Sequence, residues 1–254
     1  MAKRERSREP ALSRPGSRPA GARPPSRPSV GQSALEWVRS LLVAVVLFLI
    51  IRTFLVQTFT ITSESMVPTL LVSDWLMISK VTYGPQIPFT GARLPGYRKP
   101  RLDDIVVFRP PTEPDLDVVK RVVAVGGDTI GMKGGRLYRD SRFVDGRSII
   151  HTDPGDDQTN PMMVWQKQYV VGVSPAAYQP TRDNWGPLVV PPGQLFVMGD
   201  NRDDSLDSRY WGFLDPRRVE GNVLFIYYSF DHDSVRPLPF LTAIRWSRIG
   251  RIVR

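Results

Sequence analysis

Residues 117–128 read DVVKRVVAVGGD, and this stretch gives the clearest indication of the fold. Valines lie on both sides of a lysine–arginine pair, and two glycines and an aspartate end the run. Short β-branched runs that end at turn-forming residues are typical of β-strands. Similar runs occur on both sides of it: WLMISKV (75–81), DIVVFR (104–109), KQYVVGV (167–173), QLFVMG (194–199) and GNVLFIYYSF (221–230).

The spacing of these runs predicts a mainly β domain over residues 57–254. Glycine and proline interrupt the chain throughout, and no stretch beyond residue 57 repeats its apolar residues with a helical period. We therefore expect a coiled antiparallel β-sheet or a β-barrel. Residues 129–190 are richer in turn-forming residues, and we expect them to form an inserted β excursion from the main sheet.

An apolar run near the N-terminus predicts a transmembrane helix. Leu41 to Ile51 is a run of eleven apolar residues, and with Arg39 and Arg52 as interruptions the apolar segment extends over 35–56, within an expected transmembrane helix of residues 33–56. About 20 residues cross a bilayer, so the segment is long enough if Arg52 lies near an interface. A buried core helix is the alternative, but we expect no preceding globular domain that would bury it.

Residues 1–32 are rich in arginine, proline and serine and contain almost no large apolar residue. Such a segment cannot bury enough surface to fold, so we expect a disordered tail. Basic residues before the apolar segment predict a cytoplasmic tail and an extracytoplasmic domain. The following residues, QTFTITSES (57–65), contain no Ala-x-Ala-like site, which favours a retained signal-anchor over a cleavable signal peptide.

Composition argues against several kinds of chemistry. The 254 residues include no cysteine and only two histidines, His151 and His232, which excludes disulfides and disfavours a zinc site. We expect no metal and no cofactor. The net charge is +9, but residues 1–39 carry nine Lys and Arg against three Asp and Glu, so +6 belongs to this N-terminal part. Nucleic-acid binding needs a basic face on a folded domain, so we expect no nucleic-acid partner.

The stretch TSESMVPTL (62–70) contains two serines two residues apart. If it is extended, Ser63 and Ser65 project to the same face, where one hydroxyl can attack and the other can donate to a developing oxyanion. Two turn serines are the alternative, because serine is common in turns. A nucleophilic serine needs a base, and both histidines lie in polar, aspartate-rich loops.

Lys120 is the candidate for that base. It has two valines before it and two more after Arg121, surroundings that no other lysine of the chain has. Burial there would lower the pKa of its amine towards neutrality. The alternative is a lysine placed on an edge strand, where it discourages aggregation. This stretch alone leaves both interpretations open.

A third stretch, GDNRDDSLDSRYWG (199–212), is dense in charge but is flanked by apolar residues. A solvated loop is one interpretation. The Gly-Asp-Asn beginning and the Tyr-Trp-Gly end instead indicate a tightly hydrogen-bonded turn, which would orient a lysine by giving its amine a hydroxyl partner.

Together these stretches resemble the bacterial type I signal peptidases (leader peptidases), membrane-anchored serine proteases with a Ser–Lys dyad. TSESMVPTL resembles their nucleophile box, LDDIVVFRPP (102–111) their second box, DVVKRVVAVGGD their lysine box and GDNRDDSLDSRYWG their last. The four boxes follow the family's order within residues 40–230. The resemblance implies an endopeptidase of the bacterial cell membrane that cleaves signal peptides after Ala-x-Ala-like sites.

The resemblance also implies a role for each matched residue. Ser65 matches the nucleophile and Lys120 the general base, while Ser63 matches the oxyanion-hole hydroxyl, with the Ser65 N–H as second donor. Ser205 matches the hydroxyl that positions the lysine amine. The matched supporting residues are Asp207, Arg209, Asp200 and Arg121. The candidates for the substrate pocket are Ile61, Met66, Leu70, Val118 and Val119.

Four positions differ from the residues usual in the family. Thr62 and Gly126 replace proline, Glu64 replaces a small residue, and Asp204 replaces asparagine. None of them removes a catalytic group, although Glu64 would alter the rim of the cleft and the substrate preference.

The resemblance implies that the substrate lies extended along residues 61–65 and 117–119. The expected partners are signal peptides of secreted preproteins and the lipid bilayer, and we expect a monomer. We interpret the C-terminal RWSRIGRIVR as a closing strand or tail, with contact to anionic headgroups as the alternative.

Three rival functions fit the sequence less well. A self-cleaving Ser–Lys repressor is soluble and carries a DNA-binding head, which residues 33–56 argue against. A membrane-anchored β-domain that binds an envelope partner would leave Lys120 and the Ser205 loop without a purpose. A histidine-based hydrolase would be inactivated by His232→Ala.

Overall fold

The computed structural model describes residues 30–253 apart from positions 89, 145, 147, 154 and 156, with side chains from Glu36 onward. The predicted disordered tail, residues 1–32, lies outside the described residues except for its last three, which begin a helix. The chain divides into two compact units, Met1–Val45 and Val46–Arg254.

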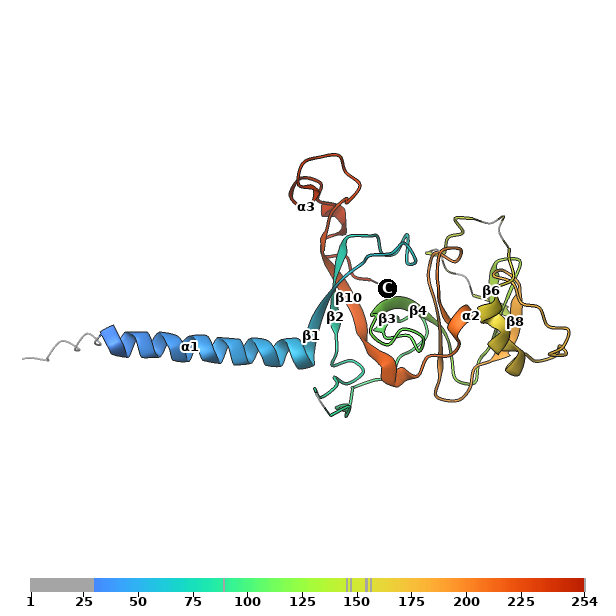
Figure 1. Ribbon diagram of the computed structural model, residues 1–254, viewed down its shortest axis with the longest axis horizontal. Coiled ribbons are helices and arrows are strands. Elements are labelled where there is room, and N and C mark those ends of the chain that lie inside the picture. The colour runs from blue at the N-terminus through green and yellow to red at the C-terminus, as the bar shows by residue number, and fades with distance from the viewer. Residues whose placement is uncertain are drawn as a thin grey trace, which may run out of the picture. The chain divides into compact units, whose positions relative to one another are not determined.

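A long apolar helix begins in the first unit and ends in the second. The α-helix α1 (Val30–Ile50) continues as the π-helical turn η1 (Ile51–Leu55) (Figure 1). Glu36–Leu55 has a mean hydropathy of 2.3 over 20 residues, long and apolar enough to cross a membrane. It is the single helix of this kind among the described residues. The crossing of a membrane by residues 33–56 stays a prediction.

The second unit is built on a six-stranded antiparallel sheet with the order β1-β2-β10-β3-β4-β9. Its strands are β1 (Val56–Thr60), β2 (Asp74–Ser79), β3 (Ile105–Phe108), β4 (Val118–Val125), β9 (Leu195–Met198) and β10 (Val219–Ser229). The last strand, orange to red in Figure 1, enters the sheet between β2 and β3. This insertion places β10 in the interior of the sheet.

A smaller antiparallel sheet has the order β7-β6-β5-β8. Its strands are β5 (Thr129–Lys133), β6 (Arg136–Arg139), β7 (Arg142–Phe143) and β8 (Trp185–Val189). The remaining helical segments are η2 (Pro161–Gln168), α2 (Ser208–Trp211), η3 (Pro216–Arg218), α3 (Pro239–Thr242) and η4 (Trp246–Arg248).

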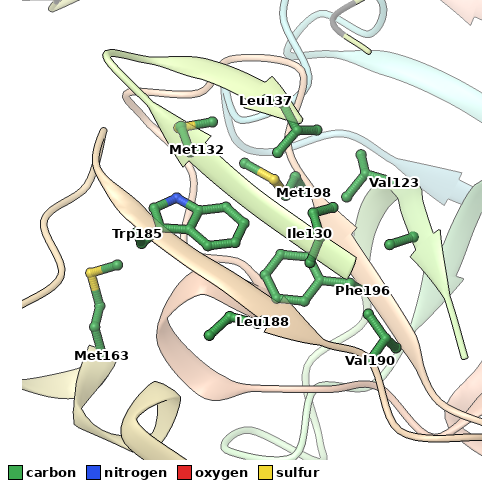
Figure 2. Packing of buried hydrophobic residues seen from close by; sticks show 11 residues of the cluster. Val123, Ile130, Met132, Leu137, Met163, Trp185, Leu188, Val190, Phe196 and Met198 are labelled. Atoms are coloured by element: carbon green, nitrogen blue, oxygen red, sulfur yellow. The ribbon is translucent and has the colours of Figure 1, made fainter. Parts of the chain in front are cut away.

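One hydrophobic cluster joins the two sheets. Figure 2 shows Trp185 of β8 against Phe196 of β9, with ring centroids 5.3 Å apart and planes inclined by 20°. Ile130 of β5 and Met198 of β9 lie in the same buried cluster. A stacked aromatic pair inside an apolar cluster fixes how the small sheet packs against the β9 side of the main sheet.

The prediction of a mainly β domain is confirmed, but the barrel alternative is wrong. In the part of the chain that the structure describes, β1 and β9 are the edges of the main sheet, so it does not close. The outer side of β9 is covered instead, because Leu195 and Leu214 exchange two backbone hydrogen bonds of 2.9 and 2.8 Å. A covered edge is protected from pairing with other chains without closure.

The predicted strand at KQYVVGV (167–173) is also wrong. Its first residues end η2, and Val170 makes only an isolated bridge to Leu188. The Asn160 side chain accepts the N–H of Met162, and Pro161 follows it, which is a favourable beginning for a helix. The helix that begins at this cap includes Lys167 and Gln168, the first two residues of the predicted strand.

Candidate active site

The serine stretch forms a turn, which is the alternative to the extended segment. β1 ends at Thr60, and the N–H of Val67 donates to the carbonyl of Glu64 at 3.0 Å. The two serines nevertheless meet, because the hydroxyl oxygens of Ser63 and Ser65 are 3.3 Å apart. Their proximity comes from the turn and not from the alternation of a strand.

Lys120 meets this turn from the main sheet. It lies in β4 opposite Val106 of β3 and is 3% exposed. Its Nζ is 2.5 Å from Oγ of Ser65, which is itself a buried residue. At this distance a proton can pass from the hydroxyl to a neutral amine without rearrangement. The edge-strand interpretation of Lys120 is wrong, because β4 pairs with β3 on one side and with β9 on the other.

The surroundings of Lys120 lower the pKa of its amine to about 8. Burial is the largest cause, since the protein interior disfavours the ammonium form. The Asp207 carboxylate raises this pKa and the Arg209 guanidinium lowers it. With a pKa near 8, about one lysine in ten is neutral at pH 7, compared with about one in 2,500 for a free lysine.

Asp200 connects the lysine strand to the serine turn. Its carboxylate accepts two hydrogen bonds from Arg121, of 2.8 and 2.7 Å, and one from the hydroxyl of Thr69. Arg121 follows Lys120 in β4, and Thr69 belongs to the serine turn, so one carboxylate ties the two segments together. The structure thus brings together Asp200 and Arg121, two of the four matched supporting residues. Nothing in the sequence indicated that the Thr69 hydroxyl donates to Asp200, because a single threonine in a turn is common.

Asp207 and Arg209 form a fully buried ion pair near Lys120. Two hydrogen bonds of 2.9 Å join the guanidinium to the two carboxylate oxygens. Burial alone would raise the pKa of Asp207, but Arg209, the Ser205 hydroxyl and the Gly199 N–H hold this pKa below its usual value. The Ser205 hydroxyl donates to Asp207 at 2.8 Å. Between the described residues Ser205 and Lys120 we find no hydrogen bond, so the positioning of the amine by Ser205 stays a prediction.

Gly199 permits a close approach between the serine turn and the Ser205 segment. A Cβ at this position would lie 2.4 Å from the carbonyl oxygen of Ser65 and 2.4 Å from Oγ of Ser205. Side chains do not tolerate such contacts, so the position requires glycine.

Four of the five expected pocket residues lie together in one buried cluster: Ile61, Met66, Leu70 and Val119. Val118 packs instead against a second cluster, which contains Val106. Successive residues of a strand face opposite sides of the sheet, so Val118 and Val119 point away from each other. Val118 therefore lies apart from the other four candidates, and its part in the substrate pocket stays a prediction.

Arg248, near the C-terminal end, also contacts the serine turn. Its guanidinium pairs with Asp74, and Nη2 donates to the carbonyl of Thr69 at 3.0 Å. Asp74 accepts two further hydrogen bonds, from the Ser229 hydroxyl at 2.7 Å and the Leu71 N–H at 2.8 Å. The sequence predicted a closing strand or tail for RWSRIGRIVR, or contact with headgroups. Neither interpretation includes the contact of Arg248 with Asp74 and Thr69, because these two residues lie far away in the sequence.

We predict that Arg248→Met strongly destabilises the protein. The change leaves Asp74, which is 0% exposed, as a buried carboxylate without its cation, and breaking such a pair typically costs about 3–5 kcal/mol. Urea unfolding of the detergent-solubilised full chain measures the effect as a lower midpoint. Arg251→Met replaces an exposed arginine three residues later and is the matched control, expected to leave the midpoint unchanged. Equal midpoints for the two variants would contradict the prediction.

Two groups of described side chains have the composition of a cation site: His151, Asp183 and Asp203, and Asp231, His232 and Asp233. In the first group a guanidinium nitrogen of Arg182 is 2.9 Å from Asp183 and 3.8 Å from Asp203 and offsets part of their charge. Neither group includes a residue of the serine turn or the lysine strand. The absence of a metal and of a cofactor stays an expectation.

Comparison with known proteins identifies the family. Residues 34–228 match the family described as "Signal peptidase, peptidase S26". The chain belongs to this family. Signal peptidase I of Pseudomonas aeruginosa is 31% identical over 233 residues, which cover 86% of this chain and 79% of the relative. Signal peptidase I of Aquifex aeolicus is 32% identical over 241 residues, which cover 81% of this chain and 88% of the relative.

A crystal structure of a signal peptidase I from Enterococcus faecalis V583 is 28% identical and covers 49% of this chain and 97% of that chain, with a TM-score of 0.32. The sequence matches confirm the resemblance to signal peptidases. They support a peptidase that cleaves signal peptides as a serine protease. The family and the apolar N-terminal helix are consistent with a membrane-anchored protein.

Proposed function

We propose that Ser65 is the nucleophile of a signal peptidase and that neutral Lys120 is its general base. The observation that carries the proposal is the 2.5 Å distance between Nζ of Lys120 and Oγ of Ser65, both in buried residues. Lys120 takes the hydroxyl proton, and Oγ attacks the scissile carbonyl carbon. The ammonium then protonates the leaving amine, and an acyl-enzyme remains. Water, deprotonated by Lys120, releases the signal peptide.

The developing oxyanion needs hydrogen-bond donors close to the nucleophile. The hydroxyl of Ser63, 3.3 Å from Oγ of Ser65, is one donor, and the N–H of Ser65 is the other. The Asp207–Arg209 pair and the Asp200–Arg121 pair support the lysine side of the site. The Ser205 hydroxyl, which donates to Asp207 in this structure, positions the lysine amine in this proposal.

The substrate lies extended beside residues 61–65 and 117–119 and pairs with their backbone. Ile61, Met66, Leu70 and Val119 lie in one buried cluster beside the serine turn, and they are the residues that line the substrate pocket in this proposal. Small pockets there select Ala-x-Ala-like sites before the cut. Glu64 is exposed between the two serines and lies at the rim of the cleft.

The proposed topology places the active site at the outer face of a bacterial cell membrane. Residues 33–56 form the single anchor, residues 1–32 the cytoplasmic tail and residues 57–254 the extracytoplasmic catalytic domain. Residues 129–190, which include the small sheet, are an excursion from the main one. The protein acts as a monomer on exported preproteins.

The rival functions are less well supported. The candidate transmembrane helix argues against a soluble self-cleaving repressor. A binding module has no use for a buried lysine against a serine hydroxyl. A histidine-based hydrolase requires a histidine at the nucleophile, but His232 lies 3.1 Å from Asp233 in an exposed loop, so we expect His232→Ala to be harmless.

The test is cleavage of a preprotein with an Ala-x-Ala site by the detergent-solubilised full chain between pH 6 and 10. Only the neutral amine accepts a proton, so the rate rises with pH, with a midpoint near the Lys120 pKa of about 8. Mass spectrometry of the product identifies the cut. Replacing the alanine before the cut by phenylalanine should abolish cleavage. A midpoint near 6.5, the usual histidine pKa, would contradict Lys120 as the base.

A further inference from the structure

Residues 150–153 lie alongside residues 200–203, and we call the segment 150–153 the strap. Ile150 and Asn201 form a parallel bridge. The N–H of Ile150 donates to the carbonyl of Asp200, and the N–H of Arg202 donates to the carbonyl of Ile150, both at 3.0 Å. The strap comes from the region of the small sheet, whereas residues 200–203 belong to the last sequence box of the family. The bridge thus connects the small-sheet region to the active site.

Side chains of the strap add further contacts. The Thr152 hydroxyl donates to the side-chain oxygen of Asn201 at 3.0 Å. Nδ1 of His151 is 2.9 Å from a carboxylate oxygen of Asp203, and the N–H of Asp153 donates to the other at 2.7 Å. The strap is therefore held at Ile150 by the bridge and at Asp153 by the hydrogen bond to Asp203. Thr152 lies between these two residues and donates its hydroxyl to Asn201.

Asn201 contacts the nucleophile turn directly. Its backbone N–H donates to the carbonyl of Ser65 at 3.1 Å, and its side-chain nitrogen donates to the carbonyl of Glu64 at 3.5 Å. The Glu64 carbonyl and the Ser65 N–H are the two sides of one planar peptide group. A donor that holds this carbonyl therefore also sets the direction of the Ser65 N–H, which is the proposed oxyanion donor.

We propose that Thr152 is a positioning residue for Ser65 and acts through the side-chain amide of Asn201. This inference rests on the proposed function. The hydroxyl of Thr152 fixes the amide oxygen of Asn201, so the amide nitrogen is turned towards the Glu64 carbonyl. Asn201 is 1% exposed, so no water replaces the lost donor freely. Without the hydroxyl the amide rotates, and the peptide group of Ser65 loses one of its supports.

The expected effect is on the chemical step. Thr152→Val keeps the shape of the side chain and removes its donor, and loss of one neutral hydrogen bond corresponds to about a fivefold decrease in kcat. KM should stay within about twofold, since the substrate contacts at 61–65 and 117–119 remain. The midpoint of the pH profile should not move, because the contacts of Lys120 are untouched.

Further variants of the full chain in detergent test this inference. Thr152→Ser keeps the hydroxyl and should restore kcat. Thr181→Val is the matched control, because the Thr181 hydroxyl bonds Asn184 in the same region and not residues 200–203. In an Asn201→Ala background, Thr152→Val should have no further effect, since its partner is gone. Wild-type kcat for Thr152→Val, or an undiminished effect in the Asn201→Ala background, would overturn the inference.

Ser65→Ala measured alongside separates this inference from the proposed function. If Ser65→Ala still cleaves, the nucleophile assignment fails whatever Thr152 does. If Ser65→Ala is inactive and Thr152→Val equals wild type, only the role of Thr152 is wrong. A decrease in kcat that Thr152→Ser reverses supports both.

Discussion

Ser65→Ala is expected to reduce preprotein cleavage by about a thousandfold or more, because no other oxygen is in place to form the acyl-enzyme. The fold should not change, since the contacts of the Ser65 hydroxyl are those with Ser63 and Lys120. Single-turnover assays with enzyme in excess measure the rate, and thermal unfolding of the same samples reports the fold. The acyl-enzyme should form with wild type and be absent in the variant.

Two further serine variants test whether the loss of activity is specific to Ser65. Ser174→Ala replaces an exposed serine outside the site and should cleave at the wild-type rate. Ser63→Ala removes one proposed oxyanion donor, so we expect a loss of about 100- to 1,000-fold. The assignment of Ser65 is wrong if Ser65→Ala keeps more than a tenth of the wild-type rate, or if Ser63→Ala is the more damaging change.

The strands of the main sheet could be predicted because their apolar residues are local signals. DVVKRVVAV became β4 and GNVLFIYYSF became most of β10, each bounded by turn-forming residues. Burial of Lys120 could be predicted for the same reason. Whether β4 was an edge or an interior strand could not, because strand order depends on β9 and β3, which lie far apart in the sequence.

The residues that hold the serine turn in place through hydrogen bonds could not be predicted from local sequence patterns. Thr69, Asn201 and Arg248 act through hydrogen bonds to segments far away in the chain, and each residue type is ordinary in a turn or tail. An extended backbone would place Ser63 and Ser65 on one face of a strand, but a turn, the other interpretation, brings them together. A motif can therefore indicate which groups meet without indicating the backbone that makes them meet.

Lys120→Met is expected to abolish cleavage and to make the protein more stable. Methionine fills a similar volume without a base, so the loss of activity should match that of Ser65→Ala. Lys133→Met, which replaces an exposed lysine in β5, is the matched control and should change neither activity nor stability. A catalytic lysine that is costly to bury predicts opposite signs for the two effects, whereas a structural lysine predicts that both decrease together.

The stability effect depends on pH in a defined direction. The pKa of Lys120 is about 8 in the folded protein and 10.5 for a free lysine side chain, a difference that corresponds to about 3 kcal/mol. Below pH 8 both states carry the proton, so wild type bears the full cost of the buried ammonium. Between pH 8 and 10.5 the unfolded state binds more protons, so wild-type stability rises with pH towards that of Lys120→Met. Urea midpoints at pH 7 and pH 10 measure this convergence, and a variant less stable than wild type at pH 7 would show that the lysine stabilises the fold.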